Sequence, residues 1–177
     1  EKQEEKEKTI DWAELDKECN ASLSFIRSRY SSIEQEVTQD IEVIGDSVDF
    51  NATQINNLEK ALQSAVDVIP QDSLRILESK YEDIKNTYSG NNEMVSELLE
   101  DLRDFKTRIN DQYHNFEIKY KKKDNTEGKK RFQSFGKQFN DVVDKINSLE
   151  LAVENIQDKA KNNNEKIFSL LAIFDKE

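Results

Sequence analysis

Apolar residues recur every three or four positions along most of the chain, a pattern typical of helices that pack side by side. The clearest track consists of Phe132, Phe135, Phe139, Val142, Ile146, Leu149, Val153, Ile156, Ala160, Ile167, Leu170 and Phe174. Its steps alternate between three and four, with the polar residue Asn163 at the position between Ala160 and Ile167, so the period is close to 3.5 residues. The track predicts one long helix packed in coiled-coil fashion.

Two further tracks predict two more long helices. The first consists of Trp12, Leu15, Cys19, Ile26, Tyr30, Ile33, Val37, Ile41, Ile44, Val48, Ile55, Leu58, Leu62, Ala65 and Ile69. The second consists of Leu74, Leu77, Tyr81, Ile84, Tyr88, Val95, Leu98, Leu102, Phe105, Ile109, Tyr113, Phe116 and Tyr120. Ser89-Gly90-Asn91-Asn92 weakens the second track, but Tyr88 and Val95 are one heptad apart. We therefore expect the second helix to continue through these four residues.

Two segments without a helical pattern predict the turns. Pro70 is expected to end the first helix, because its ring clashes with the preceding turn. Asp72 or Ser73 could then cap the second helix by accepting a hydrogen bond from a backbone N–H. Residues 121–130 contain no apolar side chain and predict the second turn.

The expected fold is all-α: an elongated antiparallel three-helix bundle, up-down-up, with coiled-coil packing. Its helices should cover about residues 11–69, 73–121 and 128–176, in a single domain of residues 10–177 that follows a charged tether of residues 1–9. Folding at the two turns places Ile55 opposite Tyr88 and Phe116 opposite Phe135. The plan is similar to a stretched spectrin-type repeat, a likeness of architecture alone.

The regular pattern is interrupted near the middle of the predicted bundle. Asn51 or Ala52, Asn91 or Asn92, and Ala160 are expected to share one layer, with Asn163 a turn away. Such a small, polar layer buries little apolar surface. It can either fix the register of the helices or act as a hinge.

The composition of the chain excludes several classes of ligand and site. Charged residues make up 36% of the chain and the net charge is −11, which argues against nucleic acid as the main ligand. Cys19 is the only cysteine, so neither an internal disulfide nor a cysteine-based zinc site can form. No apolar run approaches the ~20 residues of a membrane span. We expect no cofactor.

Motifs for catalysis are missing as well. His114 is the only histidine, so the paired Glu-x-x-His pattern of di-iron bundles cannot occur. The predicted register keeps Cys19 well away from His114, which disfavours a dyad of the two. No glycine cluster resembles a phosphate-binding loop. The chain is therefore predicted not to be an enzyme.

One charged segment is unusual and is called the basic turn here: residues 119–131. It carries a net charge of +5, with Asp124 and Glu127 against the cations Lys119, Lys121, Lys122, Lys123, Lys129, Lys130 and Arg131. It can be a plain solvated turn, a docking site for an acidic protein segment, or a contact with an anionic membrane surface.

The N-terminal end of the first helix should project past the basic turn. It carries Trp12, Leu15 and Cys19 on one stripe. The stripe can fold over the end of the bundle and pack locally, or it can bind a partner helix.

The interpretation that fits these features is a non-enzymatic, rod-shaped scaffold or adaptor. It would bind acidic or amphipathic helical segments of other proteins through the basic turn and residues 11–19, in the cytoplasm or at the cytoskeleton. The alternative is a secreted or lipid-anchored microbial surface protein that binds a host ligand. A membrane-curving dimer is a third interpretation, disfavoured by the acidic charge, and homo-oligomerisation stays open.

Overall fold

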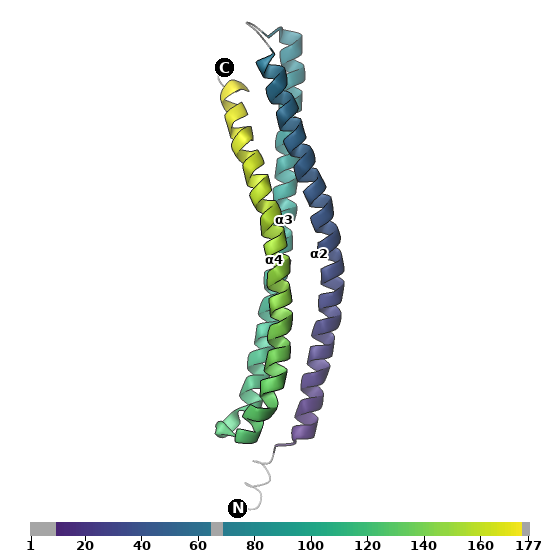
Figure 1. Ribbon diagram of the computed structural model, residues 1–177, viewed down its shortest axis with the longest axis vertical. Helices are drawn as coiled ribbons and strands as arrows, with labels where there is room; N and C mark the ends of the chain where they lie inside the picture. Colours follow the sequence, from purple (N-terminus) through teal and green to yellow (C-terminus); the bar gives the residue numbers. More distant parts are fainter. Residues whose placement is uncertain (1–9, 65–68, 175–177) are drawn as a thin grey trace, which may run out of the picture. The chain divides into compact units, whose positions relative to one another are not determined.

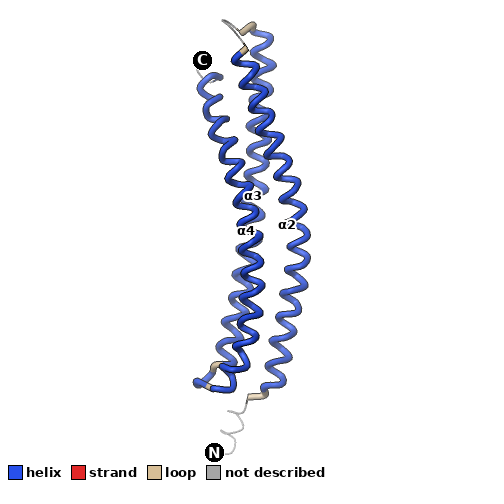
Figure 2. Tube along the Cα trace, viewed as in Figure 1, coloured by secondary structure: helices blue, strands red, loops and turns tan. Residues whose placement is uncertain are grey.

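A computed structural model describes residues 10–64 and 69–174, and nearly all of these residues lie in helices. The long helices are α2 (Trp12–Gln63), α3 (Gln71–Tyr120) and α4 (Thr126–Phe174), and a 3-10 turn, η1 (Lys122–Asp124), precedes α4 (Figure 1). No strand occurs in the described part (Figure 2). The predicted all-α arrangement of three mutually packed helices is confirmed, whereas the tether predicted at residues 1–9 lies outside the described residues.

The chain divides into two compact units, and each long helix contributes to both. Unit 1 comprises Glu1–Gln35 and Arg103–Asn147, and unit 2 comprises Glu36–Leu102 and Ser148–Glu177. The expectation of a single domain over residues 10–177 stays a prediction.

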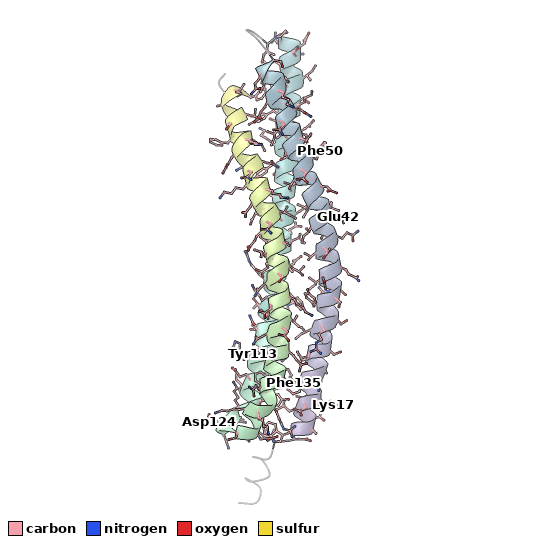
Figure 3. All side chains as sticks on the ribbon, viewed as in Figure 1. Lys17, Glu42, Phe50, Tyr113, Asp124 and Phe135 are labelled. Carbon is pink, nitrogen blue, oxygen red and sulfur yellow. The ribbon has the colours of Figure 1, made fainter. Side chains whose placement is uncertain are left out.

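Unit 1 has an aromatic core between α3 and α4. The ring of Phe116 stacks on Phe139 at 6.1 Å, and Tyr120 contacts Phe132 at 5.5 Å and Phe135 at 5.8 Å between centroids. These contacts agree to within one helical turn with the predicted pairing of Phe116 and Phe135. Figure 3 labels Tyr113 and Phe135 among the side chains of this unit.

Unit 2 has an aliphatic core to which all three helices contribute. Its buried members are Ile55, Leu58, Leu77, Tyr81, Ile84, Ile167 and Leu170. The ring of Tyr81 stacks on Phe174 at 4.8 Å between centroids, which joins α3 to the end of α4. In unit 2 the repeating apolar positions of each helix therefore form one buried face, as the sequence predicts.

Three asparagines are buried in unit 2, as the pattern of small polar positions predicted, but they do not form a single layer. The Asn51 Nδ2 donates to the Ile84 carbonyl at 3.1 Å, and the Asn163 Nδ2 donates to the Val48 carbonyl at 3.0 Å. Ile84 precedes Asn91 by seven residues, about two turns of α3. Asn51 of α2 therefore contacts α3 at a different level from Asn91, so the prediction of one shared layer is wrong.

The position of the first turn explains this difference. α2 ends at Gln63, seven residues before Pro70, so Pro70 is not what ends it. Instead, the Pro70 carbonyl accepts the Leu74 N–H at 2.9 Å, which places the proline at the entry to α3. Asp72 already lies inside the first turn of α3, so the predicted cap at Asp72 or Ser73 is wrong. Residues 65–68, where the first helix was expected to continue, lie outside the described residues.

α3 runs without a break through Ser89-Gly90-Asn91-Asn92, which confirms the continuous second helix. Among residues 10–64 and 69–174, no helix is long and apolar enough to cross a membrane.

Candidate functional site

The basic turn is held in shape by backbone and side-chain hydrogen bonds. The Asn125 Oδ1 accepts the backbone N–H groups of Glu127 at 3.0 Å and Gly128 at 3.2 Å, which makes Asn125 the N-cap of α4. Lys123 and Asp124 have positive φ angles of 61° and 52°, so the chain reverses through the left-handed region. The lysines of the turn are therefore displayed on a defined backbone.

Gly128 allows the first turn of α4 to approach the end of α3. A Cβ at this position would overlap the Tyr120 carbonyl and would lie 2.8 Å from the Trp12 Cη2. Only hydrogen fits here. The glycine thus fixes how closely α2, α3 and α4 meet in unit 1.

A carboxylate on α2 ties the basic turn to the N-terminal end of that helix. The Tyr120 hydroxyl donates to the Asp16 Oδ1 at 2.7 Å, and the Arg131 Nη1 donates to the Asp16 Oδ2 at 2.7 Å. The Trp12 ring stacks on Tyr120 at 5.9 Å, and the Arg131 guanidinium lies 5.6 Å from the Trp12 ring centroid. Charge-assisted hydrogen bonds of this kind are stronger than neutral ones.

The predicted stripe on residues 11–19 is largely used inside unit 1. Leu15 is 8% exposed and Cys19 is fully buried, and Trp12 is half-buried against Tyr120. Burial raises the pKa of the Cys19 thiol to about 12, against a smaller lowering by the neighbouring Tyr120 hydroxyl. Burial and the hydrogen bond to Asp16 raise the pKa of Tyr120 as well. The structure therefore favours local packing over a partner-binding stripe for Leu15 and Cys19.

Three of the predicted cations are engaged with acidic side chains of unit 1. Lys121 pairs with Glu117 at 3.1 Å, Lys129 pairs with Asp124 at 3.3 Å, and Arg131 bonds Glu127 and Asp16, each at 2.7 Å. The hydrogen bond from Lys121 is the main cause of the lowered pKa of Glu117. These cations contribute less free charge to a partner than the sequence alone suggests.

Four lysines remain exposed without an ion pair among the described residues, and they are called the lysine surface here: Lys119, Lys122, Lys123 and Lys130. The Lys119 Nζ lies 5.3 Å from the centroid of the Phe116 ring. Compact, strongly hydrated ammonium groups such as these attract carboxylates without demanding one fixed geometry.

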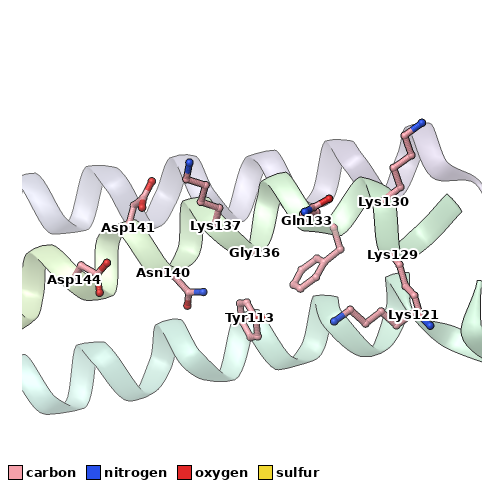
Figure 4. A pocket seen from close by; sticks show the side chains of 11 residues that line it. Tyr113, Lys121, Lys129, Lys130, Gln133, Gly136, Lys137, Asn140, Asp141 and Asp144 are labelled. Atoms are coloured by element: carbon pink, nitrogen blue, oxygen red, sulfur yellow. The ribbon is translucent and has the colours of Figure 1, made fainter. Parts of the chain in front are cut away.

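A groove of about 750 Å³ adjoins the lysine surface on the α3–α4 side of unit 1. Figure 4 shows its two ends: Lys121, Lys129 and Lys130 lie at one end, and Asp141 and Asp144 lie at the other. The middle is formed by Tyr113, Phe132 and Gly136, and a Cβ at Gly136 would lie 3.2 Å from the Tyr113 ring. Phe132 is only 2% exposed, so the half-buried Tyr113 supplies the aromatic surface of the groove. This surface lies beside a cationic end, which suits a segment with both apolar and acidic side chains.

The remaining candidates for chemistry do not assemble into a site. The side chain of His114 is 65% exposed and lies 3.6 Å from the Glu117 carboxylate. Within the described ranges, no three or more His, Cys, Asp and Glu side chains gather as metal ligands would.

Sequence reasoning missed Asp16 and Gly128, on which the geometry of the site depends. Asp16 lies four residues after Trp12 and three before Cys19, so helical spacing already placed it on the same side of α2. Asn125, followed by Thr126 and Glu127, was a readable N-cap signal. No local sequence pattern indicates the role of Gly128, because that role depends on contacts with α2 and α3.

Comparisons with protein-family models, with curated proteins and with solved structures find no match for this chain.

Proposed function

We propose that this protein is a non-enzymatic scaffold or adaptor module that binds an acidic, amphipathic helical segment of another protein at the lysine surface. The observation that carries the proposal is the exposure of four lysines without an ion pair among the described residues, beside a groove with the half-buried Tyr113 in its middle. Charge would attract the partner, and aromatic contact would hold it.

The distribution of charge supports a protein partner rather than nucleic acid. The basic turn holds +5 within a chain of net charge −11, so the other residues carry −16. A polyanion such as DNA would be repelled by most of the molecule, whereas a short acidic segment needs only the lysine surface. An anionic membrane surface is the competing ligand for the same lysines.

For the helices, we propose the up-down-up order and the coiled-coil packing of a spectrin-type repeat. In unit 1, three contacts between α2 and α4 support parallel helices: Asp16 with Arg131, Arg27 with Gln138, and Tyr30 with Lys145. Contacts between α3 and α4 support antiparallel helices, because Lys106 contacts Asn147 whereas Tyr120 contacts Phe132.

Charge reversal at the lysine surface tests the proposed function. In one variant Lys122, Lys123 and Lys130 become Glu, and in the matched control Lys159, Lys161 and Lys166, which are also exposed, become Glu. Because both triplets change the net charge equally, only a site-specific contact distinguishes them. We expect the first variant to lose partner capture in a pull-down and the control to keep it.

Salt and lipid provide the second arm of that experiment. Capture by the parent protein should weaken as ionic strength rises, since exposed charges are screened within about 10 Å at 0.1 M salt. Binding to vesicles that contain phosphatidylserine, with no protein captured, would instead assign the lysine surface to a membrane. Equal capture by both triple variants would place the binding site elsewhere.

A further inference from the structure

A second groove, of about 540 Å³, lies between α2 and α3 in unit 1. Its buried lining consists of Ile26, Phe105 and Ile109. At its edge Phe25 is 72% exposed. Exposed apolar surface that continues into a groove is typical of a protein-binding site.

The charged residues that line this groove are mainly basic. Arg29 from α2 and Arg108 from α3 line it, and Asp111 is the single acidic side chain in the lining. Neither arginine forms an ion pair with another described residue. The groove thus combines an aromatic edge with arginines, and both residue types are enriched at protein interfaces.

Unit 2 carries a stripe of the opposite character on α2. Val43 is 54% exposed and Phe50 is 58% exposed. Glu42, Asp46 and Asp49 lie within four residues of them in the sequence, and residues 40–50 contain no lysine or arginine. Figure 3 labels Glu42 and Phe50 on this segment. The stripe is apolar and acidic where the groove of unit 1 is apolar and basic.

We propose that the groove of unit 1 binds the residue 43–50 stripe of unit 2 from a second copy of this chain. Phe25 and Arg29 are four residues apart, as are Asp46 and Phe50. Two antiparallel helices therefore place Phe25 opposite Phe50 in the same register that places Arg29 opposite Asp46.

A second copy is the occupant that the chain itself supplies. Apolar contact and charge match in one register, and no other partner has to be assumed. Each copy has one groove and one stripe, so the contact can close into a pair or continue into a longer assembly. This proposal is independent of the lysine surface and would survive the failure of the proposed function.

Sedimentation velocity of the chain over a range of concentrations tests self-association. We expect the parent protein to reach at least twice its 20.7 kDa mass. Arg29→Glu and Asp46→Arg should each weaken the association at least about tenfold, because each brings like charges together. An equimolar mixture of the two variants should recover it, since the glutamate introduced at position 29 faces the arginine introduced at position 46.

A matched pair of apolar substitutions provides the control. Phe25→Glu should abolish the association, whereas Phe168→Glu, at a side chain with the same 72% exposure, should leave it intact. Circular dichroism checks that all variants keep their helix content. A parent protein that sediments as a monomer at every concentration would overturn the proposal, as would a mixture of the charge variants that fails to associate.

Discussion

The buried asparagines of unit 2 differ in how well their amides are satisfied. The Asn163 Nδ2 donates to a carbonyl of α2, whereas no hydrogen-bond acceptor among the described residues reaches the Asn91 Nδ2. A buried polar group without a partner costs about 1–3 kcal/mol, while an ordinary hydrogen bond contributes about 1 kcal/mol. Asn91 therefore contributes less to the stability of unit 2 than Asn163 does.

Replacing each asparagine by leucine separates these effects. Asn91→Leu should raise the free energy of unfolding by about 1–2 kcal/mol, because it removes an unpaired buried amide. Asn163→Leu removes a formed hydrogen bond and should therefore raise the free energy of unfolding by less. Urea unfolding followed by circular dichroism measures both, and a larger gain at Asn163 would contradict the assigned hydrogen bonds.

Alkaline pH should destabilise unit 1 through Cys19. The thiol pKa is 9.0 in an unperturbed environment and about 12 in the fold, so the native state retains a proton that the unfolded chain loses. The contribution of Cys19 to the free energy of unfolding is therefore fully present below pH 9. It falls between pH 9 and 12, by up to about 1.4 kcal/mol per pH unit.

The raised pKa of Tyr120 acts in the same direction, because its folded state also holds the proton. Thermal unfolding at pH 8 and pH 10.5 measures the loss. Cys19→Ala should reduce the pH dependence, since it removes one of the two groups. A melting temperature that does not change between these pH values would refute the burial of both groups.

At the scale of the helices, the glycines test which positions are crowded. Nothing lies within 4 Å of a Cβ added at Gly45 or Gly90, both inside helices, whereas a Cβ at Gly128 would overlap α3. Gly45→Ala and Gly90→Ala should each stabilise by about 0.5–1 kcal/mol. Gly128→Ala should destabilise by about 1–3 kcal/mol or more. Chemical denaturation compares the three, and a neutral Gly128→Ala would contradict the close approach of α3 and α4.

Apolar periodicity predicted the helices well because each helix buries one continuous face. The same reasoning correctly predicted that α3 continues through Gly90, because Tyr88 and Val95 are one heptad apart. It placed the first turn wrongly, because Pro70 is compatible with the end of one helix and with the start of the next. Local sequence does not distinguish these roles, and the pairing of α2 with α3 shifted as a result.

The candidate site was predictable only in part for a similar reason. The cluster of lysines is visible in the sequence, but which of them stay unpaired depends on acidic residues of neighbouring turns and helices. Arg131 is occupied by Asp16, 115 residues away in the chain. Leu15 and Cys19 share a heptad stripe with Trp12, yet periodicity alone does not say whether that stripe packs inside unit 1 or outside it.

At the scale of the molecule, the two units should differ in local stability. The core of unit 1 is rich in stacked aromatic rings, whereas unit 2 buries Asn51, Asn91 and Asn163. Hydrogen exchange should therefore be faster around the three asparagines than around Phe116 and Phe135. Uniform protection in both units would contradict this difference.

The most direct test of the proposed function is site-specific photo-cross-linking. Benzoylphenylalanine replaces Lys123 in the lysine surface, or Lys159 on α4 as the exposed control, and each protein is irradiated in an extract of cells that produce it. The proposed function predicts a discrete cross-linked protein from position 123 that disappears at high salt, and none from position 159. Adducts from position 159 alone would contradict binding at the lysine surface.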